Sequence, residues 1–226
     1  MTIEIETVEI EDTVRKIRDE INTRIKTSAL KPTHQKKFVD WLQNLNQIQD
    51  QILEIKKVVL PLIKKDLRYS FTNKNLIITA MVQPSLKNTI DEIKVHFHNE
   101  PDFEMFNDEL TKLGTCPETA KSLAWIGDTV IKFAILKQIW KPRITSEELH
   151  NTRKSLENNK NLSDLCDRWK LYEHRIHFDD SDKIPQPNTL LKNKGTLVES
   201  MYGIIFIEKK IKGVQKAIHL IDPSIN

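Results

Sequence analysis

Two acidic residues of the sequence stand among apolar neighbours, where ionised side chains are uncommon. Asp128 lies near the middle of the apolar segment LAWIGDTVIKFAIL at 123–136. Glu199 lies in a second apolar segment, LVESMYGIIFI at 197–207. Asp usually works as a cap at a helix N-terminus rather than inside an apolar helix. Because an ionised carboxylate in apolar surroundings is costly unless it is paired or bound to a cation, these two acids are the first candidates for chemistry.

Each of the two segments also contains a glycine, Gly127 beside Asp128 and Gly203 one turn after Glu199. A glycine inside a helix costs about 1 kcal/mol relative to alanine, which a close approach of two helices offsets. If the helices pack at these glycines, the two carboxylates converge and repel each other, and a hard divalent cation relieves the repulsion. Oxygen ligands with retained waters are typical of Mg²⁺. A shared Mg²⁺, with Mn²⁺ as a substitute, is therefore one interpretation of these residues.

Two other interpretations of the same residues stay open. Asp128 and Glu199 could both face solvent on amphipathic helices, which is the commoner situation for acidic residues. Glu199 could also lie in the first turn of its helix, where a negative charge complements the helix dipole.

Composition limits the class of protein. The 226 residues are 38% hydrophobic and 30% charged, which is typical of a soluble globular protein. No apolar run approaches the roughly 18 residues of a spanning helix, and the acidic start MTIEIETVEIED is unlike a signal peptide. Cys116 and Cys166 form no CxxC pair, and Walker, dinucleotide-binding and G-x-S-x-G motifs are absent. We therefore expect a cytoplasmic location, no membrane association and no nucleotide cofactor.

Charge is distributed unevenly along the chain. Residues 55–89 carry seven Lys and Arg against one Asp, whereas residues 90–118 carry two Lys against eight acids. Residues 119–226 are basic again. Basic segments suit phosphate binding, but they are also typical of ordinary solvated faces.

The elements that position the two acids are expected to be helices, so the predicted fold class is all-α. Apolar residues at spacings of three and four predict helices from about residue 11 to 66, broken at Lys31-Pro32. We interpret this stripe as core packing, with an added helical hairpin or a dimerisation surface as the alternative. Short helices are expected over 57–89, with Thr72 or Asn73 as a cap, followed by an acidic connection over 90–115. Three longer apolar helices are expected over 119–140, 146–171 and 193–221.

Four segments, in order, resemble signature segments of the ribonuclease III family. LAWIGDTV at 123–130 is similar to the family's L-E-F-L-G-D-A-V, and TLVESMYGIIFI at 196–207 is similar to its D-V-F-E-A-L-I-G-A-I-Y-L. Between them, RKSLENNKNLS at 153–163 resembles the family's R-A-x-L-V-x-N-x-x-L-A helix. Upstream, residues 63–88 resemble its opening segment, a glycine-tyrosine-phenylalanine turn before a leucine-rich helix and a histidine-proline-serine.

The resemblance implies a division of the chain into two parts. Residues 57–222 would form a ribonuclease III-like endonuclease domain with an acidic insertion at about 90–115. Residues 1–56 would form an N-terminal helical extension.

The chain departs from the usual family pattern at two of its four acids. Ala124 stands where the first signature normally has Glu, and Thr196 stands where the second has Asp. The retained Asp and Glu make the pattern similar to the mini-ribonuclease III branch, which lacks a double-stranded-RNA-binding domain and is active. That branch's signatures read like L-A-Y-I-G-D and S-T-x-F-E-A-L-L-G-Y-L-F-L. The long N-terminal region and the 63–88 segment differ from that branch, so the chain combines a full-length-style beginning with a mini-style site.

By this resemblance the protein would be an endoribonuclease of RNA processing. It would use Mg²⁺ to hydrolyse double-stranded or structured RNA, leaving 5′-phosphate and 3′-hydroxyl ends. Asp128 and Glu199 would be the catalytic and metal-binding residues, and Thr196 would be an accessory hydroxyl, with a helix-start cap as the alternative. The candidate phosphate contacts, each otherwise an ordinary exposed base, are Arg153, Lys154, Lys192 and Lys194.

The resemblance also implies a homodimer, because a single site per chain cuts only one strand of a duplex. Trp125, Phe133 and Trp140 are candidates for the dimer interface, with core packing as the alternative. The missing acids favour a rival hypothesis, a catalytically inactive homologue that acts as an RNA-binding or ribosome-associated scaffold. A helical protein-interaction module is a third interpretation, supported only by the N-terminal stripe.

Overall fold

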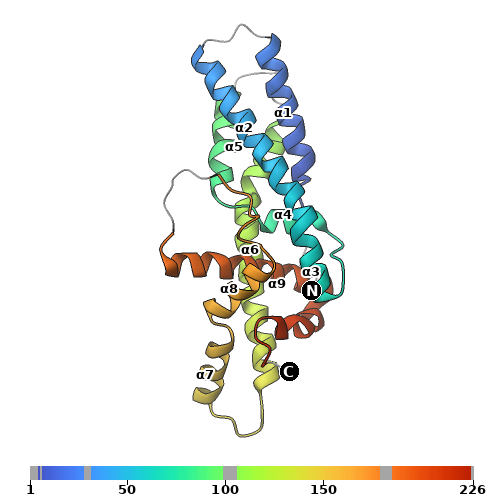
Figure 1. The fold of residues 1–226 in the computed structure, drawn as a ribbon, viewed down its shortest axis with the longest axis vertical. Coiled ribbons are helices and arrows are strands. Elements are labelled where there is room, and N and C mark those ends of the chain that lie inside the picture. The colour runs from blue at the N-terminus through green and yellow to red at the C-terminus, as the bar shows by residue number, and fades with distance from the viewer. Residues whose placement is uncertain (1–4, 6, 28–31, 99–105, 179–184, 225–226) are drawn as a thin grey trace.

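Apolar side chains at spacings of three and four make the N-terminal part of the chain helical, as the sequence predicts. The computed structural model describes all residues except 1–4, 6, 28–31, 99–105, 179–184 and 225–226. Helix α1 (Ile10–Thr27) and helix α2 (Pro32–Glu54) lie side by side at one end of an elongated molecule (Figure 1). A π-helical turn, Ile55–Val59, then joins α2 to α3 (Leu60–Leu67) without a break. Because α1 ends at Thr27 and α2 begins at Pro32, the expected break near Pro32 is confirmed.

Two shorter helices follow, α4 (Lys74–Ala80) and α5 (Ser85–His96). The side chain of Asn73 accepts a hydrogen bond from the backbone N–H of Leu76 at 3.1 Å and caps α4. Of the two expected caps, Asn73 is therefore the correct one. The carboxylate of Glu208 accepts from the backbone N–H groups of Thr72 and Asn73 at 3.0 Å, which ties this turn to the C-terminal part of the chain.

The prediction of an acidic connection over 90–115 is wrong for most of that range. Residues 90–96 belong to α5, and α6 begins at Asn107 and continues to Ile139 (Asn107–Ile139). The described acids of this range are exposed or half-buried (Asp91, Glu92, Asp108 and Glu109), while the apolar residues near them are buried at helical spacing (Ile90, Ile93, Leu110 and Leu113). Spacing therefore decides the structure of this segment, not its charge. Residues 99–105, with Pro101, lie outside the described part of the chain.

The C-terminal third contains α7 (Ser146–Leu156), α8 (Asn159–Arg168) and α9 (Pro187–Ala217), which ends in a 3₁₀ turn, Ile218–Leu220. The single helix expected over 146–171 is wrong, because the chain breaks at Asn158. The Asn158 side chain accepts from the backbone N–H of Asn161 at 2.9 Å and starts α8 as a new helix. Asn is a preferred residue at such a helix start, which explains the break.

One hydrophobic core runs from Ile10 to Ile221 and includes the apolar side chains of α1 and α2. The core-packing interpretation of the N-terminal stripe is therefore confirmed. In the described residues, regular structure is helical apart from one isolated parallel bridge between Val82 and Ile176, so the predicted all-α class is correct. The division at residues 56 and 57 falls inside the unbroken run from α2 to α3 and stays a prediction.

Helix α6 runs along most of the molecule, and α9 crosses it near the middle (Figure 1). This crossing brings the two apolar segments with their acids together. None of the described helices is both long and apolar enough to span a bilayer.

Candidate active site

Helices α6 and α9 cross with their backbones in direct contact at Gly127 and Gly203. A Cβ atom on Gly127 would overlap the carbonyl oxygen of Glu199, and it would lie 2.9 Å from the backbone nitrogen of Gly203. A Cβ atom on Gly203 would overlap the carbonyl oxygen of Leu123. No side chain larger than hydrogen fits at either position. The predicted close approach of the two glycine-bearing helices is therefore confirmed.

The crossing brings the charges of Asp128 and Glu199 into the same region. Burial is the main reason that the pKa of Glu199 is raised from its ordinary value of 4.5 to about 7, and the negative charge of Asp128 raises it further. Because α9 begins at Pro187, Glu199 lies about three turns inside the helix. The first-turn interpretation of Glu199 is thus wrong.

The two carboxylates differ in their partners. The Nζ atom of Lys132, one helical turn along α6, lies 2.7 Å from Oδ2 of Asp128. Both side chains of this pair are about two-fifths exposed, and an exposed pair contributes only about 0–1 kcal/mol to stability. Within the described residues, Glu199 forms no ion pair and accepts no side-chain hydrogen bond. One acid is therefore loosely neutralised and the other is not.

A third acid beside the site, Glu157 at the end of α7, was missed by the sequence reasoning. Its side chain is only 14% exposed, and it pairs with Arg153 one turn earlier. Burial raises its pKa and the charge of Asp128 raises it further, while the charge of Glu157 in turn raises the pKa of Glu199. One carboxylate oxygen, Oε2, is buried without a hydrogen-bond partner. The sequence feature that could have indicated Glu157 is that this acid stands at the valine position of the family's R-A-x-L-V segment.

The oxygen donors of this region fit a magnesium ion that is completed by phosphate oxygens. Among the described residues, no group of three or more His, Cys, Asp or Glu side chains is arranged to hold a metal ion. Proteins usually bind Mg²⁺ through one or two carboxylates together with substrate phosphates and waters, rather than by a cage made of protein alone. Asp128 and Glu199 provide such a pair, and the unpaired carboxylate of Glu199 is the better available donor.

The accessory residue of the expected site, Thr196, is engaged with its own helix. Its hydroxyl donates to the carbonyl oxygen of Lys192 at 3.1 Å. Since α9 begins nine residues earlier at Pro187, the alternative of a helix-start cap is wrong. At the other departure from the family pattern, the small side chain of Ala124 is buried in α6. An accessory role for Thr196 stays a prediction.

The four candidate phosphate contacts fall into two kinds. Arg153 pairs with Glu157, and Nζ of Lys194 lies 2.7 Å from a carboxylate oxygen of Asp167, so both cations already have acidic partners. Lys154 and Lys192 are exposed and form no ion pair with any described residue. Only the second kind is available to RNA without a rearrangement.

The three aromatic residues proposed for a dimer interface are exposed, Trp125 and Phe133 on α6 and Trp140 directly after its end. Trp125 is 81% exposed, Phe133 is 55% exposed and Trp140 is 66% exposed. Their alternative interpretation as core residues is therefore wrong. Large exposed apolar side chains along one helix are typical of an interaction surface.

The helical fold and the two acids near the α6–α9 crossing can be compared with known families. Residues 121–210 match the model of the ribonuclease III domain. This span includes Asp128, Glu157, Glu199 and the crossing itself. Over these residues, which are less than half of the chain, the protein thus carries a segment that matches the domain of the ribonuclease III family, a family of endoribonucleases. A search of the curated proteins found no match.

Proposed function

We propose that this protein is a Mg²⁺-dependent endoribonuclease that hydrolyses phosphodiesters of double-stranded or structured RNA. The products would carry 5′-phosphate and 3′-hydroxyl ends. The observation that carries the proposal is the crossing of α6 and α9, which brings Asp128 and Glu199 together inside the ribonuclease III domain. The similarity of the acid pattern to the active mini branch supports the same proposal.

The residues of the site would divide the work among them. Asp128 and Glu199 would hold Mg²⁺, which when bound lowers the pKa of a water and stabilises the leaving 3′ oxygen. Lys132 pairs with Asp128 in the free protein and would turn to a phosphate oxygen when RNA binds. Lys154 and Lys192, exposed on the two helices that flank the site, would contact the RNA backbone.

The exposed aromatic residues support a homodimer as the working form. One site cuts one strand, so a second copy of the chain is needed to cut both strands of a duplex. Trp125, Phe133 and Trp140 would be covered by the same surface of that second copy, as in other two-fold symmetric interfaces. Duplex RNA would be recognised by its shape, through phosphates and 2′-hydroxyls across the minor groove.

The experiment that tests this proposal compares purified native protein with Asp128→Asn and Glu199→Gln on labelled duplex RNA, with Mg²⁺ or with EDTA. Asp164→Asn and Glu147→Gln are matched controls, because both acids are exposed within the same domain and away from the crossing. We expect Mg²⁺-dependent cutting that is lost in both site variants and kept in both controls. Cutting that persists in EDTA, or equal cutting by all five proteins, would contradict the proposal.

A second function is favoured by specific observations, namely a catalytically inactive, RNA-binding scaffold. Lys132 neutralises Asp128, Ala124 replaces a usual acid, and the described residues hold no three-ligand metal cluster. In the same experiment an inactive homologue would bind duplex RNA without cutting it, and neither site substitution would change the binding.

A further inference from the structure

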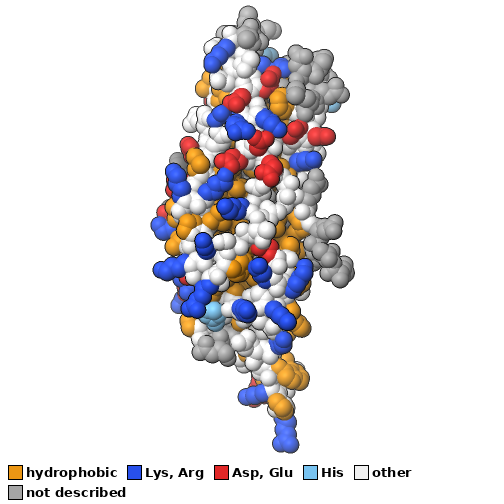
Figure 2. Space-filling model, turned by 90° about the vertical axis from the view of Figure 1, so that its right-hand side faces the viewer, with side chains coloured by type: hydrophobic (Ala, Val, Ile, Leu, Met, Phe, Trp, Pro, Cys, Tyr) orange, Lys and Arg blue, Asp and Glu red, His pale blue; other side chains and the backbone are white. Residues whose placement is uncertain are grey.

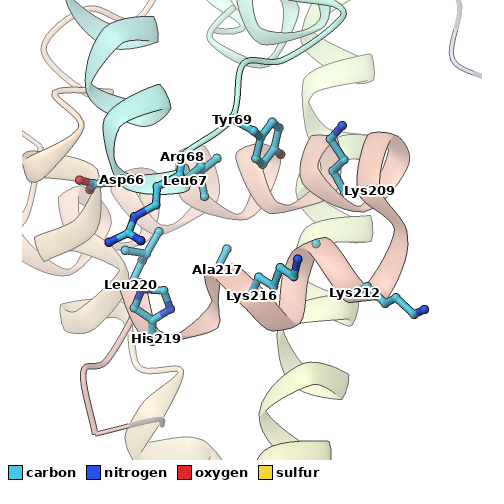
Figure 3. Close-up of a pocket in the computed structure, with 11 residues that line it drawn as sticks. Asp66, Leu67, Arg68, Tyr69, Lys209, Lys212, Lys216, Ala217, His219 and Leu220 are labelled. Atoms are coloured by element: carbon cyan, nitrogen blue, oxygen red, sulfur yellow. The ribbon is translucent and has the colours of Figure 1, made fainter.

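A pocket in the surface lies away from the crossing, between the end of α3 and the C-terminal part of α9 (Figure 3). Its volume is about 700 Å³, which is in the range of pockets that hold a small organic ligand. Lys209, on its rim, lies ten residues beyond Glu199, or about 15 Å along the helix. The pocket shares no lining residue with the candidate active site.

A sharp turn in α9 creates this pocket. Lys210 has a positive φ of 56° and interrupts the helix, so the segment after it runs back beneath the first part, as Figure 3 shows. The hydroxyl of Tyr202 donates to the carbonyl oxygen of Ala217 at 2.6 Å and holds the returning segment in place. A Cβ atom on Gly213 would overlap that of Lys209, so the close return requires glycine. The concavity is therefore a built feature of the fold.

The lining of the pocket is strongly basic. It includes Arg68, Lys209, Lys212, Lys216 and His219. None of the Arg and Lys side chains in this set forms an ion pair with a described acid; the Nζ atom of Lys209 lies 5.2 Å from the ring centre of Tyr69 instead.

The pocket's acid does not neutralise these cations. Asp66 accepts a hydrogen bond from Nε1 of Trp169 at 2.9 Å and lies 3.3 Å from Nε of Arg168. Its charge is therefore already balanced by a cation outside the pocket. Unpaired positive charges gathered in a concavity attract anions, because the surrounding low-dielectric protein concentrates their field.

A buried hydroxyl in the pocket wall also lacks a partner. The side-chain oxygen of Tyr69 is out of contact with solvent and makes no hydrogen bond. Burial and the nearby charge of Glu208 raise the pKa of Tyr69 well above its usual range, so the group stays protonated as a donor. A buried donor without an acceptor is destabilising, and an anionic oxygen that reached it from the pocket would relieve this.

The basic surface extends beyond this pocket. A second, shallower hollow is lined by Lys137 of α6 and shares Lys212 and Lys216 with the first. In Figure 2, which faces the side of the molecule with α3 and the end of α9, Lys and Arg side chains predominate over the middle and lower part. Two adjoining basic hollows fit an extended polyanion better than a single compact anion.

The shape of the site favours an unpaired strand over a duplex. A pocket of this volume admits a nucleotide, whereas a double helix can contact only its rim. Apolar side chains in the wall, Leu67 and Leu220, offer surface for a base, and the cations of the lining would contact phosphates. A charged groove combined with apolar or aromatic surface is typical of single-stranded nucleic acid binding.

We propose that this pocket binds the backbone of an unpaired RNA segment that flanks the duplex held at the candidate active site. This inference rests on the proposed function in one respect, namely that the candidate active site holds an RNA duplex. The unpaired strand would enter the pocket along Lys212 and Lys216 and continue past Lys137.

The test measures RNA binding by fluorescence anisotropy in EDTA, using the whole chain. One probe is a blunt RNA duplex, and the other is the same duplex with an unpaired extension of about ten nucleotides. The variant is Lys212→Gln with Lys216→Gln, two exposed positions where the fold is not at risk. The matched control is Lys36→Gln with Lys37→Gln, two exposed lysines of α2 that lose the same charge.

We expect the extension to strengthen binding to the native protein, and the Lys212/Lys216 variant to lose about tenfold in affinity for the extended probe. Its affinity for the blunt duplex should change less than about twofold, and the control should bind both probes like the native protein. Equal losses on both probes, or equal losses in the control, would overturn the inference. If 5′-AMP displaced the extended probe as effectively as the free single strand of the extension does, the inference would also be overturned, since the site would then be a mononucleotide site.

The same data separate this inference from the proposed function. The unpaired extension alone, as a free single strand of about ten nucleotides, is the third probe. If the native protein binds none of the three probes, both fail. If the native protein binds this single strand but neither duplex, and the Lys212/Lys216 variant does not bind it, the pocket stands and the proposed duplex substrate is wrong.

Discussion

Substituting Glu199 by Gln should stabilise the metal-free protein at neutral and higher pH while removing its function. The pKa of Glu199 is about 7 in the folded protein against an ordinary value of 4.5, chiefly because the side chain is buried. The unfolded chain therefore releases this proton at lower pH than the folded protein does. As pH rises from 4.5 to 7, the free energy of unfolding therefore decreases, and this loss of stability reaches its full size above pH 7.

The size of this effect follows from the difference between the two pKa values. One pKa unit corresponds to 1.36 kcal/mol, so the raised pKa of Glu199 costs about 3 kcal/mol of stability above pH 7. Gln has a similar shape and no charge at any pH, so it avoids this cost. We expect Glu199→Gln to be more stable than the native protein by about 3 kcal/mol at pH 8 and equally stable near pH 4.5.

The assay is urea denaturation in EDTA at several pH values, with Glu147→Gln, an exposed acid of α7, as the control. The control should follow the native protein at every pH. Adding Mg²⁺ should raise the stability of the native protein but not that of Glu199→Gln, because only the native site binds the ion. A Glu199→Gln protein that is less stable than the native protein at pH 8, or a stability difference that does not change with pH, would contradict a buried Glu199 with a raised pKa.

Three further predictions concern the crossing, the exposed helix face and the break before α8. Gly127→Ala should destabilise the protein by about 3 kcal/mol or more, because its Cβ would overlap the backbone of α9. The control Gly114→Ala lies in the same helix, with no atom nearer than 3.8 Å to the new Cβ, and should be neutral or stabilising by up to about 1 kcal/mol. Equal urea midpoints of the two variants would contradict this. Trp125→Glu with Phe133→Glu should convert a dimer to a monomer in analytical ultracentrifugation without loss of stability, since both side chains are exposed. An unchanged sedimentation coefficient would contradict a dimer interface on α6. Asn158→Ala should lower the free energy of unfolding by about 1 kcal/mol through loss of the α8 cap, and a change below about 0.3 kcal/mol would show that the cap is dispensable.

The sequence was sufficient for the helices and for the crossing because both depend on local patterns. Apolar spacing of three and four located the helical runs, and two glycines inside apolar helices indicated where backbones touch. The ion pair of Asp128 with Lys132 could also have been predicted, since the two residues are four apart on one helix. These features require no knowledge of how distant segments pack.

Other features depend on contacts that the sequence does not display. The acids of residues 90–115 suggested a loop, although the buried Ile90 and Leu113 show that apolar spacing decided the structure. The place of Glu157 beside the other two acids depends on the break before Asn158, which redirects the chain. The basic pocket depends on the positive φ of Lys210, a residue type that gives no signal for such a turn.

Counting the divalent ions at the site tests whether Asp128 and Glu199 share one. Electron paramagnetic resonance of Mn²⁺ in the presence of duplex RNA would compare the native protein with Asp128→Asn, Glu199→Gln and the control Asp164→Asn. If the two acids share an ion, the native protein and the control should each bind one more tightly held Mn²⁺ per chain than either site variant. Equal numbers of bound Mn²⁺ in all four proteins would contradict a shared ion.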